Sequence, residues 1–135
     1  MSILVDTNVF LWAAGVETRL SDEAKTLLEE AATPIFFSAA SAWEIVLKWS
    51  KGRLDLPVTP RELIKSVLHA SGLSQLPIVM RDALEVAELP YHHRDPFDRL
   101  LVAQARTNGL RLMTADPILE RYDVDVIALW LDDDE

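Results

Sequence analysis

The alternation of short apolar runs with helical patterns is the feature that most constrains this fold. Each apolar run is short enough for a buried strand, and turn or capping residues separate it from the next helical segment. The expected strands are Ile3–Val5, Pro34–Ser38, Leu76–Val79, Leu110–Met113 and Val124–Leu129. Strands that alternate with helices are joined by right-handed crossovers, which produce a mostly parallel sheet covered on both faces. The sequence therefore predicts an α/β fold.

The segments between these runs carry the signals of amphipathic helices. Capping-box spacing occurs at Thr59 with Glu62, and Ser41 with Glu44 gives another example. Gly109 follows the last apolar helical segment, as a residue that ends a helix does. We expect helices over about 8–14, from Ser21, over 41–52, from Thr59, over 81–89 and over 96–108.

Composition limits the class of protein. The 135 residues suit one domain, which we place at residues 1–130, followed by an acidic tail at 131–135. The chain has no cysteine, no signal-peptide pattern and no apolar run near the ~20 residues that span a membrane, so we expect a cytoplasmic protein without membrane contact. The net charge of −9 argues against a passive binder of nucleic-acid backbone, but not against an enzyme that acts on nucleic acid.

Acidic residues recur where strands give way to helices. Asp6 follows the first strand, Glu44 lies in the first turns after the second, and Asp116 follows the strand that ends at Met113. Asp95 and Asp98, in the stretch DPFDR, open the apolar helix that leads to that strand. Each acid alone is explained by helix capping or by the helix dipole. Together, three of them follow the carboxyl ends of predicted parallel strands, which meet at one edge of a sheet.

Several carboxylates at one edge repel one another and raise their pKa values unless a cation is present. Without cysteine, and without histidine at ligand spacing, such a set favours hard cations such as Mg²⁺ or Mn²⁺. One or two such ions in an acidic pocket are the usual apparatus for phosphodiester chemistry, because the metal lowers the pKa of a bound water and stabilises the leaving oxygen. The pattern therefore favours a metal-dependent hydrolase of phosphodiesters.

Four blocks of sequence carry a family resemblance: LVDTNVFLW near the start, SAASAWEIVLKWSKGRLDLP at 38–57, HRDPFDRLLVAQA at 93–105 and LMTADPIL at 112–119. In order and spacing, from Ser2 to about Leu129, they resemble the PIN-domain toxins of the VapC type. The resemblance implies a single PIN domain with a five-stranded parallel sheet and helices on both faces. It implies a metal-dependent endoribonuclease of a toxin–antitoxin system, a homodimer, and a VapB-type antitoxin that occludes the acidic pocket. It suggests tRNA or another structured RNA as substrate.

Carried over residue by residue, the catalytic and metal-binding set of the family falls on Asp6, Glu44, Asp98 and Asp116. Three other residues are candidates for contacts to this set. Asp95 is expected mainly as a helix cap, and the Thr114 hydroxyl is placed to orient a carboxylate or a water. Asn8 stands where histidine is common in this subfamily. The residues are compatible with one bound metal ion or with two.

Several basic and aromatic residues can be explained by a structural role as well as by a functional one. Lys48 and Arg99 lie near the predicted acids, either as solvated charge or as a rim that holds RNA phosphates. The adjacent His92 and His93 lack the spacing of helical zinc ligands, so we assign them to a surface loop. The tryptophans fit a core or interface better than base stacking. They are Trp12, Trp43, Trp49 and Trp130.

Three alternative functions fit the same residues less well. A haloacid-dehalogenase-type phosphatase needs an aspartate at position 8, which is Asn8 here. A receiver-like binding module needs an acidic pair after the first strand and a phosphoacceptor aspartate after a central one, but Asp6 stands alone and Ser38 and Ala39 follow the second strand. A catalytically silent PIN scaffold is disfavoured because no member of the acidic set is missing.

Overall fold

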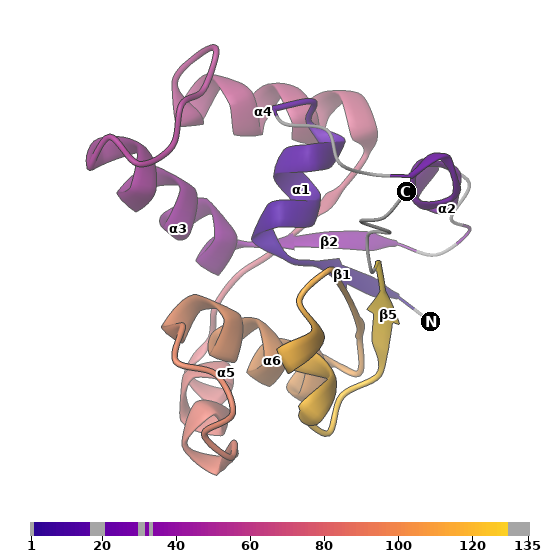
Figure 1. The fold of residues 1–135 in the computed structure, drawn as a ribbon, viewed down its shortest axis with the longest axis vertical. Coiled ribbons are helices and arrows are strands. Elements are labelled where there is room, and N and C mark those ends of the chain that lie inside the picture. Colours follow the sequence, from indigo (N-terminus) through magenta and orange to yellow (C-terminus); the bar gives the residue numbers. More distant parts are fainter. Residues whose placement is uncertain (1, 17–20, 30–31, 33, 130–135) are drawn as a thin grey trace.

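The structure is a computed structural model, and it describes residues 2–16, 21–29, 32 and 34–129. Within these ranges five strands form one sheet: β1 (Ile3–Val5), β2 (Ile35–Ser38), β3 (Ser74–Leu76), β4 (Arg111–Thr114) and β5 (Val126–Ala128). The strand order is β3-β2-β1-β4-β5, and every neighbouring pair is parallel. The predicted parallel α/β fold is therefore confirmed (Figure 1). The acidic tail predicted at 131–135 and Trp130 lie outside the described residues.

Helices pack on both faces of the sheet, as predicted. In the described chain they are α1 (Thr7–Ala13), α2 (Asp22–Glu29), α3 (Ala39–Ser50), α4 (Pro60–Ser71), α5 (Met80–Glu85) and α6 (Pro96–Asn108), with short 3₁₀ turns η1 (Val86–Glu88) and η2 (Pro117–Arg121). Alternate residues of β1 point to opposite faces. Val5 packs with Phe10 of α1 and Ile45 of α3, whereas Leu4 packs in a second core with Leu101 of α6 (Figure 1).

Several helix signals read from the sequence are confirmed by hydrogen bonds. Thr59 and Glu62 form the predicted capping box of α4, and the Ser21 hydroxyl accepts from the Ala24 N–H at 3.1 Å. Asp95 is the N-cap of α6, and Gly109 ends that helix in the left-handed conformation at φ 65°. These local signals need no tertiary contact, which is why the sequence alone predicts them.

Two boundaries near proline were predicted too far along the chain. β3 ends at Leu76 rather than running to Val79, because Pro77 has no N–H to donate to a neighbouring strand. The helix expected over 81–89 begins at Met80, ends as an α-helix at Glu85 and continues as η1. Leu89 is extended, at φ −84° and ψ 136°, since the residue before Pro90 avoids the helical region.

The capping box predicted at Ser41 and Glu44 is wrong. α3 begins directly where β2 ends, and Ser38 is its N-cap, with a hydroxyl that accepts from the Ala40 N–H at 2.9 Å. Ser41 lies inside the first turn, and its hydroxyl is 2.9 Å from that of Thr7. Because no loop separates β2 from α3, the N-cap is Ser38, three residues before the expected N-cap Ser41. Ser41 and Glu44 are consequently buried.

The strand order places a switch point at the centre of the sheet. From β1 the chain moves outward through β2 to β3, and it then returns to the other side of β1 with β4 and β5. In open α/β sheets, ligands bind beyond the carboxyl ends of the strands where the order reverses. The carboxyl ends of β1 and β4 are therefore where a site is expected. No helix in the described ranges has the length and apolar character needed to cross a membrane.

Candidate active site

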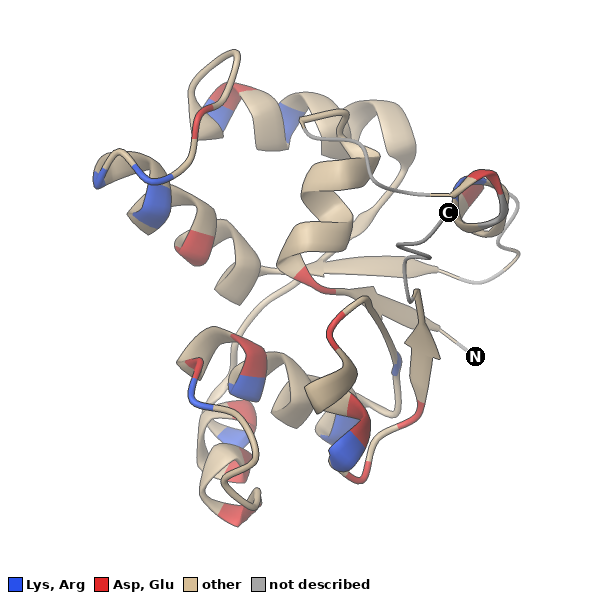
Figure 2. Cartoon of the chain, viewed as in Figure 1, with Lys and Arg blue, Asp and Glu red and all other residues tan. Residues whose placement is uncertain are grey.

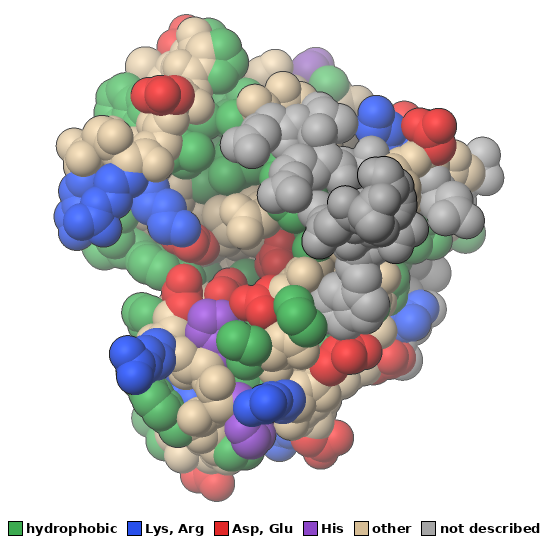
Figure 3. Space-filling view, in the orientation of Figure 1, with side chains coloured by type: hydrophobic (Ala, Val, Ile, Leu, Met, Phe, Trp, Pro, Cys, Tyr) green, Lys and Arg blue, Asp and Glu red, His purple; other side chains and the backbone are tan. Residues whose placement is uncertain are grey.

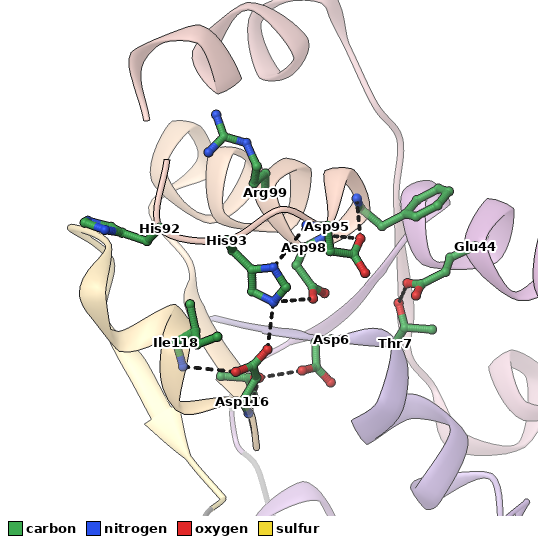
Figure 4. A network of polar contacts seen from close by, with 12 residues as sticks. Asp6, Thr7, Glu44, His92, His93, Asp95, Asp98, Arg99, Asp116 and Ile118 are labelled. Atoms are coloured by element: carbon green, nitrogen blue, oxygen red, sulfur yellow. Dashed lines mark hydrogen bonds and ion pairs between the residues drawn. The ribbon is translucent and has the colours of Figure 1, made fainter. Parts of the chain in front are cut away.

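Acidic side chains from four elements meet at this switch point. Asp6 directly follows β1, Asp116 lies two residues beyond β4, Glu44 is on α3 and Asp98 is in the first turn of α6. Figure 4 shows Asp6, Asp98 and Asp116 facing a common space, with Glu44 at its side on the neighbouring helix. In Figure 3 acidic side chains gather in a hollow near the centre of the face that is shown. The structure therefore brings together the four acids that the sequence predicts.

Asp6 is held in place from both sides. As the N-cap of α1 it accepts from the Val9 N–H through Oδ1 at 2.8 Å. Its Oδ2 accepts from the Thr114 hydroxyl at 2.5 Å, because Val5 pairs with Met113 and the next residues leave the sheet side by side. Burial raises the pKa of Asp6 to about 6 even though both hydrogen bonds lower it. The charges of Glu44 and Asp116 contribute to this rise.

Glu44 is buried on α3 between a hydroxyl and an ammonium group. The Thr7 hydroxyl donates to its Oε1 at 2.6 Å, and Lys48 Nζ donates to its Oε2 at 2.6 Å. Burial lowers the pKa of Lys48, but the hydrogen bond and charge of Glu44 outweigh that effect and raise it overall. Lys48 is therefore a charged partner of Glu44, and its side chain is 48% exposed.

Asp98 has the most perturbed environment of the four. Its side chain is 19% exposed, and it faces other acids at the site. Burial, followed by the charges of Asp95, Asp6, Glu44 and Asp116, raises the pKa of Asp98 to about 8. At neutral pH and without a cation, the Asp98 carboxyl therefore retains its proton. A group of this kind at the end of a sheet marks a functional site.

Asp116 and Thr114 connect the end of β4 to the rest of the site. The Asp116 N–H donates to the Thr114 hydroxyl oxygen at 3.0 Å, and Thr114 is fully buried. As the N-cap of η2, Asp116 accepts from the Ile118 N–H through Oδ1 at 3.0 Å. The Thr114 hydroxyl thus contacts both Asp6 and Asp116, and one side chain aligns two of the acids.

His93 lies in the loop before α6, as predicted, but its side chain enters the acid cluster and does not face solvent. Its side chain is 16% exposed, and its Nε2 lies 2.9 Å from Asp116 Oδ2 and 3.3 Å from Asp98 Oδ2. The neighbouring His92 is exposed, as predicted. No local signal separates these two adjacent histidines, because the contact between His93 and Asp116 joins residues 23 positions apart.

The comparison of sequences assigns the chain to a family. A sequence model of the PIN domain matches residues 3–125. The chain belongs to the PIN domain family. This confirms the family that the sequence blocks resemble and agrees with the acids at the sheet edge. No protein with a curated description matches the sequence.

Solved structures with a similar fold include VapBC, FitAcB and VapC proteins. VapBC2 from Rickettsia felis bound to a promoter DNA fragment matches with a TM-score of 0.71 and 15% identity, over 95% of this chain and 98% of that chain. FitAcB from Neisseria gonorrhoeae matches with a TM-score of 0.68 and 21% identity, over 95% and 98%. VapC20 from Mycobacterium tuberculosis, described as a Sarcin-Ricin loop cleaving toxin, matches with a TM-score of 0.60 and 16% identity, over 88% and 93%.

The donor set of this PIN domain fits a divalent cation. One ligand atom each of His93, Asp98 and Asp116 lies within 4.8 Å of the others, and Asp6 and Glu44 act on Asp98 through their charges. Carboxylate oxygens are the ligands that Mg²⁺ and Mn²⁺ prefer. Burial, followed by the charges of neighbouring acids, raises the pKa values of Asp6 and Asp98, so a bound cation would favour the ionised forms of both groups.

Other residues singled out in the sequence lie around this cluster. Asp95 Oδ1 accepts from the N–H groups of Phe97 at 2.8 Å and Asp98 at 3.3 Å, so the predicted cap is present. Asn8 is exposed on α1. Arg99 donates to the carbonyl oxygens of Pro90 and Val86, and its guanidinium lies 4.8 Å from the ring centre of Tyr91. These contacts favour a structural role for Arg99.

Thr7 and Ser41 are site residues that the sequence analysis missed. Thr7 follows Asp6 in LVDTNVFLW and reads as an ordinary first residue of a helix, whereas Ser41 reads as a cap. Both are buried, and the Thr7 hydroxyl lies within hydrogen-bond distance of both Ser41 and Glu44. These contacts are visible only in the packing of α1 against α3. The one sequence signal is the position of Thr7 beside a predicted ligand.

A separate cavity of about 770 Å³ lies among α1, α2 and α4. Its described lining is mainly apolar, including Phe10, Trp12 and Val67, with Lys25 and Glu29 as the charged residues. Asp6, Glu44, Asp98 and Asp116 are not among its described lining residues. This cavity is therefore separate from the cluster of acids at the sheet edge.

Proposed function

We propose that this protein is a metal-dependent endoribonuclease and the toxin of a VapBC-type toxin–antitoxin pair. The observation that carries the proposal is the convergence of four acids at the carboxyl ends of β1 and β4. Membership of the PIN family and the likeness of the fold to VapBC structures support it. The catalytic and metal-binding residues are Asp6, Glu44, Asp98 and Asp116.

The chemistry proposed is hydrolysis of an RNA phosphodiester. Bound Mg²⁺ or Mn²⁺ would lower the pKa of a water and stabilise charge on the leaving oxygen. The four carboxylates would hold the cation, directly or through water. Asp98 and Asp6 have raised pKa values without it, so they are the groups whose ionisation depends most on the cation. Thr114 and Thr7 fix the orientation of Asp6 and Glu44 through their hydroxyl groups.

A basic rim beside the acids is proposed to hold the RNA backbone. Figure 2 shows basic residues at the C-terminal end of α3, where Lys48, Lys51 and Arg53 follow Glu44. Lys48 combines a contact to Glu44 with a half-exposed side chain, so it can face a phosphate while it remains beside the site. The substrate proposed is a structured RNA, of which tRNA is one class, in the cytoplasm.

Partner proteins are proposed on the same basis. The solved structures with this fold include complexes with antitoxins, which supports a VapB-type antitoxin for this chain. Large apolar side chains are exposed on two helices, with Trp43 61% and Trp49 41% exposed on α3 and Met80 74% and Leu84 65% exposed on α5. Exposed apolar surface of this kind marks protein interfaces, which supports a homodimer.

The test is cleavage of a total-RNA pool by the purified protein freed of its antitoxin. Reactions with Mg²⁺, Mn²⁺ or EDTA are compared for the wild type, Asp98→Asn and the exposed control Asp55→Asn. We expect discrete products that require the metal and that Asp98→Asn reduces by roughly a hundredfold or more, because even a lost outer contact to a metal ligand costs 10–100-fold.

The control Asp55→Asn should cleave like the wild type. A folded protein that binds its antitoxin but cleaves no RNA with either metal would contradict the nuclease proposal. It would favour the alternative, a PIN scaffold without catalytic activity.

A further inference from the structure

His93 sits where a metal ligand would be expected. Its Nε2 contacts Oδ2 of Asp116 at 2.9 Å and Oδ2 of Asp98 at 3.3 Å, between two of the proposed ligands (Figure 4). An imidazole ligand would change which metal the site selects, because imidazole suits zinc, copper, iron and nickel, whereas carboxylates suit magnesium and manganese. The role of His93 therefore bears on the metal preference of the whole site.

The other ring nitrogen shows where the imidazole proton lies. His93 Nδ1 accepts a hydrogen bond from the Asp95 backbone N–H at 3.0 Å. A neutral imidazole has one N–H and one acceptor nitrogen, so the proton is on Nε2. A ring turned by 180° would place carbon atoms at both positions and would lose both contacts. His93 Nε2 thus donates to Asp116 Oδ2, and Asp98 Oδ2 lies 3.3 Å from the same nitrogen.

The hydrogen bonds of the His93 ring are opposite in direction to those of a metal-bound histidine. A histidine that binds metal through one nitrogen donates its other N–H to a carboxylate, a carbonyl oxygen or water. Here the other nitrogen faces the Asp95 N–H, which is itself a donor. If Nε2 gave its lone pair to a metal, the proton would move to Nδ1 and two hydrogens would face each other.

The backbone around His93 resists such a change. The Tyr122 hydroxyl oxygen accepts from the N–H groups of both His92 and His93, at 3.2 and 2.9 Å, and Tyr122 is 3% exposed. Arg99 donates to the same hydroxyl at 3.3 Å and to the Pro90 carbonyl oxygen at 3.0 Å. Hydrogen bonds therefore connect the segment before α6 to Tyr122, at the end of η2, and to α6. These bonds hold the His93 imidazole in one orientation.

We propose that His93 is a positioning residue of the cation site and not one of its ligands. Its Nε2–H donates to Asp116 Oδ2 next to Asp98 Oδ2, and it leaves the remaining lone pairs of both side chains for the cation. The donor set then consists of oxygen atoms alone, which selects Mg²⁺ and Mn²⁺ over Zn²⁺ and Ni²⁺. This inference rests on the proposed function, since it requires that the carboxylates bind a divalent cation.

The first test observes the ring proton directly. Long-range ¹H–¹⁵N spectra of the protein labelled at histidine nitrogens are recorded without metal and with Mg²⁺. His69→Ala and His92→Ala assign the signals. We expect His93 to show the Nε2–H tautomer in both states. A change to Nδ1–H when Mg²⁺ binds would overturn the proposal, because it would show that Nε2 has become a ligand.

The second test measures cation affinity by calorimetry. We expect His93→Ala to bind Mn²⁺ 10–100-fold more weakly than the wild type, as for other residues that orient metal ligands. His93→Gln keeps an N–H donor at the position of Nε2 and should restore most of the affinity. His69→Ala, which removes an exposed histidine on α4, should bind like the wild type. Equal affinity in His93→Ala would overturn the proposal, as would failure of His93→Gln to restore it.

Failure of the proposed function gives a different result from failure of this inference. If the wild type binds neither Mg²⁺ nor Mn²⁺, and Asp98→Asn gives the same result, the proposed cation site is wrong. The proposed role of His93 is then wrong as well. If the wild type binds Mn²⁺ and Asp98→Asn does not, the site stands. The behaviour of His93→Ala and His93→Gln then decides the role of His93 alone.

Discussion

Two aspartates on neighbouring helices are both largely buried, yet their environments are opposite. Asp82, on α5, accepts hydrogen bonds from the Thr107 hydroxyl at 2.6 Å, the Val79 N–H at 3.1 Å and Gln104 Nε2 at 3.3 Å. Burial raises the pKa of Asp82, but these donors outweigh it and lower the pKa overall. Asp98, on α6, faces other acids, and its pKa is raised to about 8.

The contrast shows that burial alone does not separate a structural carboxylate from a functional one. Around Asp82 the fold supplies donors that compensate the charge, and the group links α5 to α6. Around Asp98 burial and then the charges of neighbouring acids raise the pKa, and a bound cation would offset both effects. The balance of donors against like charges is therefore the better guide to a binding site.

The largest expected effect is on how stability depends on pH. The pKa values of Asp98 and Asp6 are higher in the folded state, about 8 and about 6, than the 3.8 of an unperturbed aspartate. Folding then favours the protonated forms, so their contribution is fully present below pH 4 and is lost as the pH rises through 6 and 8. For Asp98 the loss is on the order of 6 kcal/mol.

Chemical denaturation in EDTA at several pH values between 4 and 8 checks this expectation. Asp98→Asn should remove most of the decline, and it should be more stable than the wild type at pH 8. Mg²⁺ should also flatten the wild-type profile, because a bound cation offsets the repulsion. Parallel profiles for the wild type and Asp98→Asn in EDTA would contradict the assignment of the raised pKa to Asp98.

A smaller effect of opposite sign is expected at Asp82. Asp82→Asn replaces an acceptor oxygen with an NH₂ group that faces donors, so the variant should lose about 2–3 kcal/mol of unfolding free energy. Urea denaturation at neutral pH measures this loss, with the exposed Glu88→Gln as a control on the same side of the molecule. RNA cleavage per folded molecule should not change. A gain of stability would show that the donors do not compensate the charge of Asp82.

The smallest effect is expected at Thr114, which links Asp6 and Asp116. Thr114→Val removes the hydroxyl that donates to Asp6 Oδ2 and accepts from the Asp116 N–H, so we expect a loss of about 1 kcal/mol at pH 8 in EDTA. Thr114→Ser retains the hydroxyl and should recover most of that loss in the same denaturation assay. Equal stability of the two variants would assign the effect to packing and not to the hydrogen bonds.

The parts of the site that could be predicted are those set by local sequence. Asp6 and Asp116 follow short apolar strands, and the parallel topology then places them at one edge. Asp95 and Gly109 mark the ends of α6 by signals that lie within the helix. These features depend on a few adjacent residues and on general rules of α/β folds, so a single sequence is sufficient for them.

The rest of the site depends on contacts between distant segments. Thr7 and Glu44 are 37 residues apart, and His93 and Asp116 are 23 apart. Whether the histidine side chain enters the site is decided by the Tyr122 hydroxyl, which holds the preceding backbone. The boundaries at β3 and α3 were wrong for a related reason, since Pro77 and the loop-free junction at Ser38 override the apolar pattern.

The central position of β1 has a consequence for the time at which the site can form during synthesis. Asp6 is made before its partner Thr114, which lies 108 positions later on the strand that pairs with β1. Translation proceeds from the N-terminus, so a nascent chain that stops before β4 has neither Thr114 nor Asp116. Under the proposed function, such a chain cannot cleave the messenger that encodes it, and activity begins only after β4 is released from the ribosome and inserted beside β1.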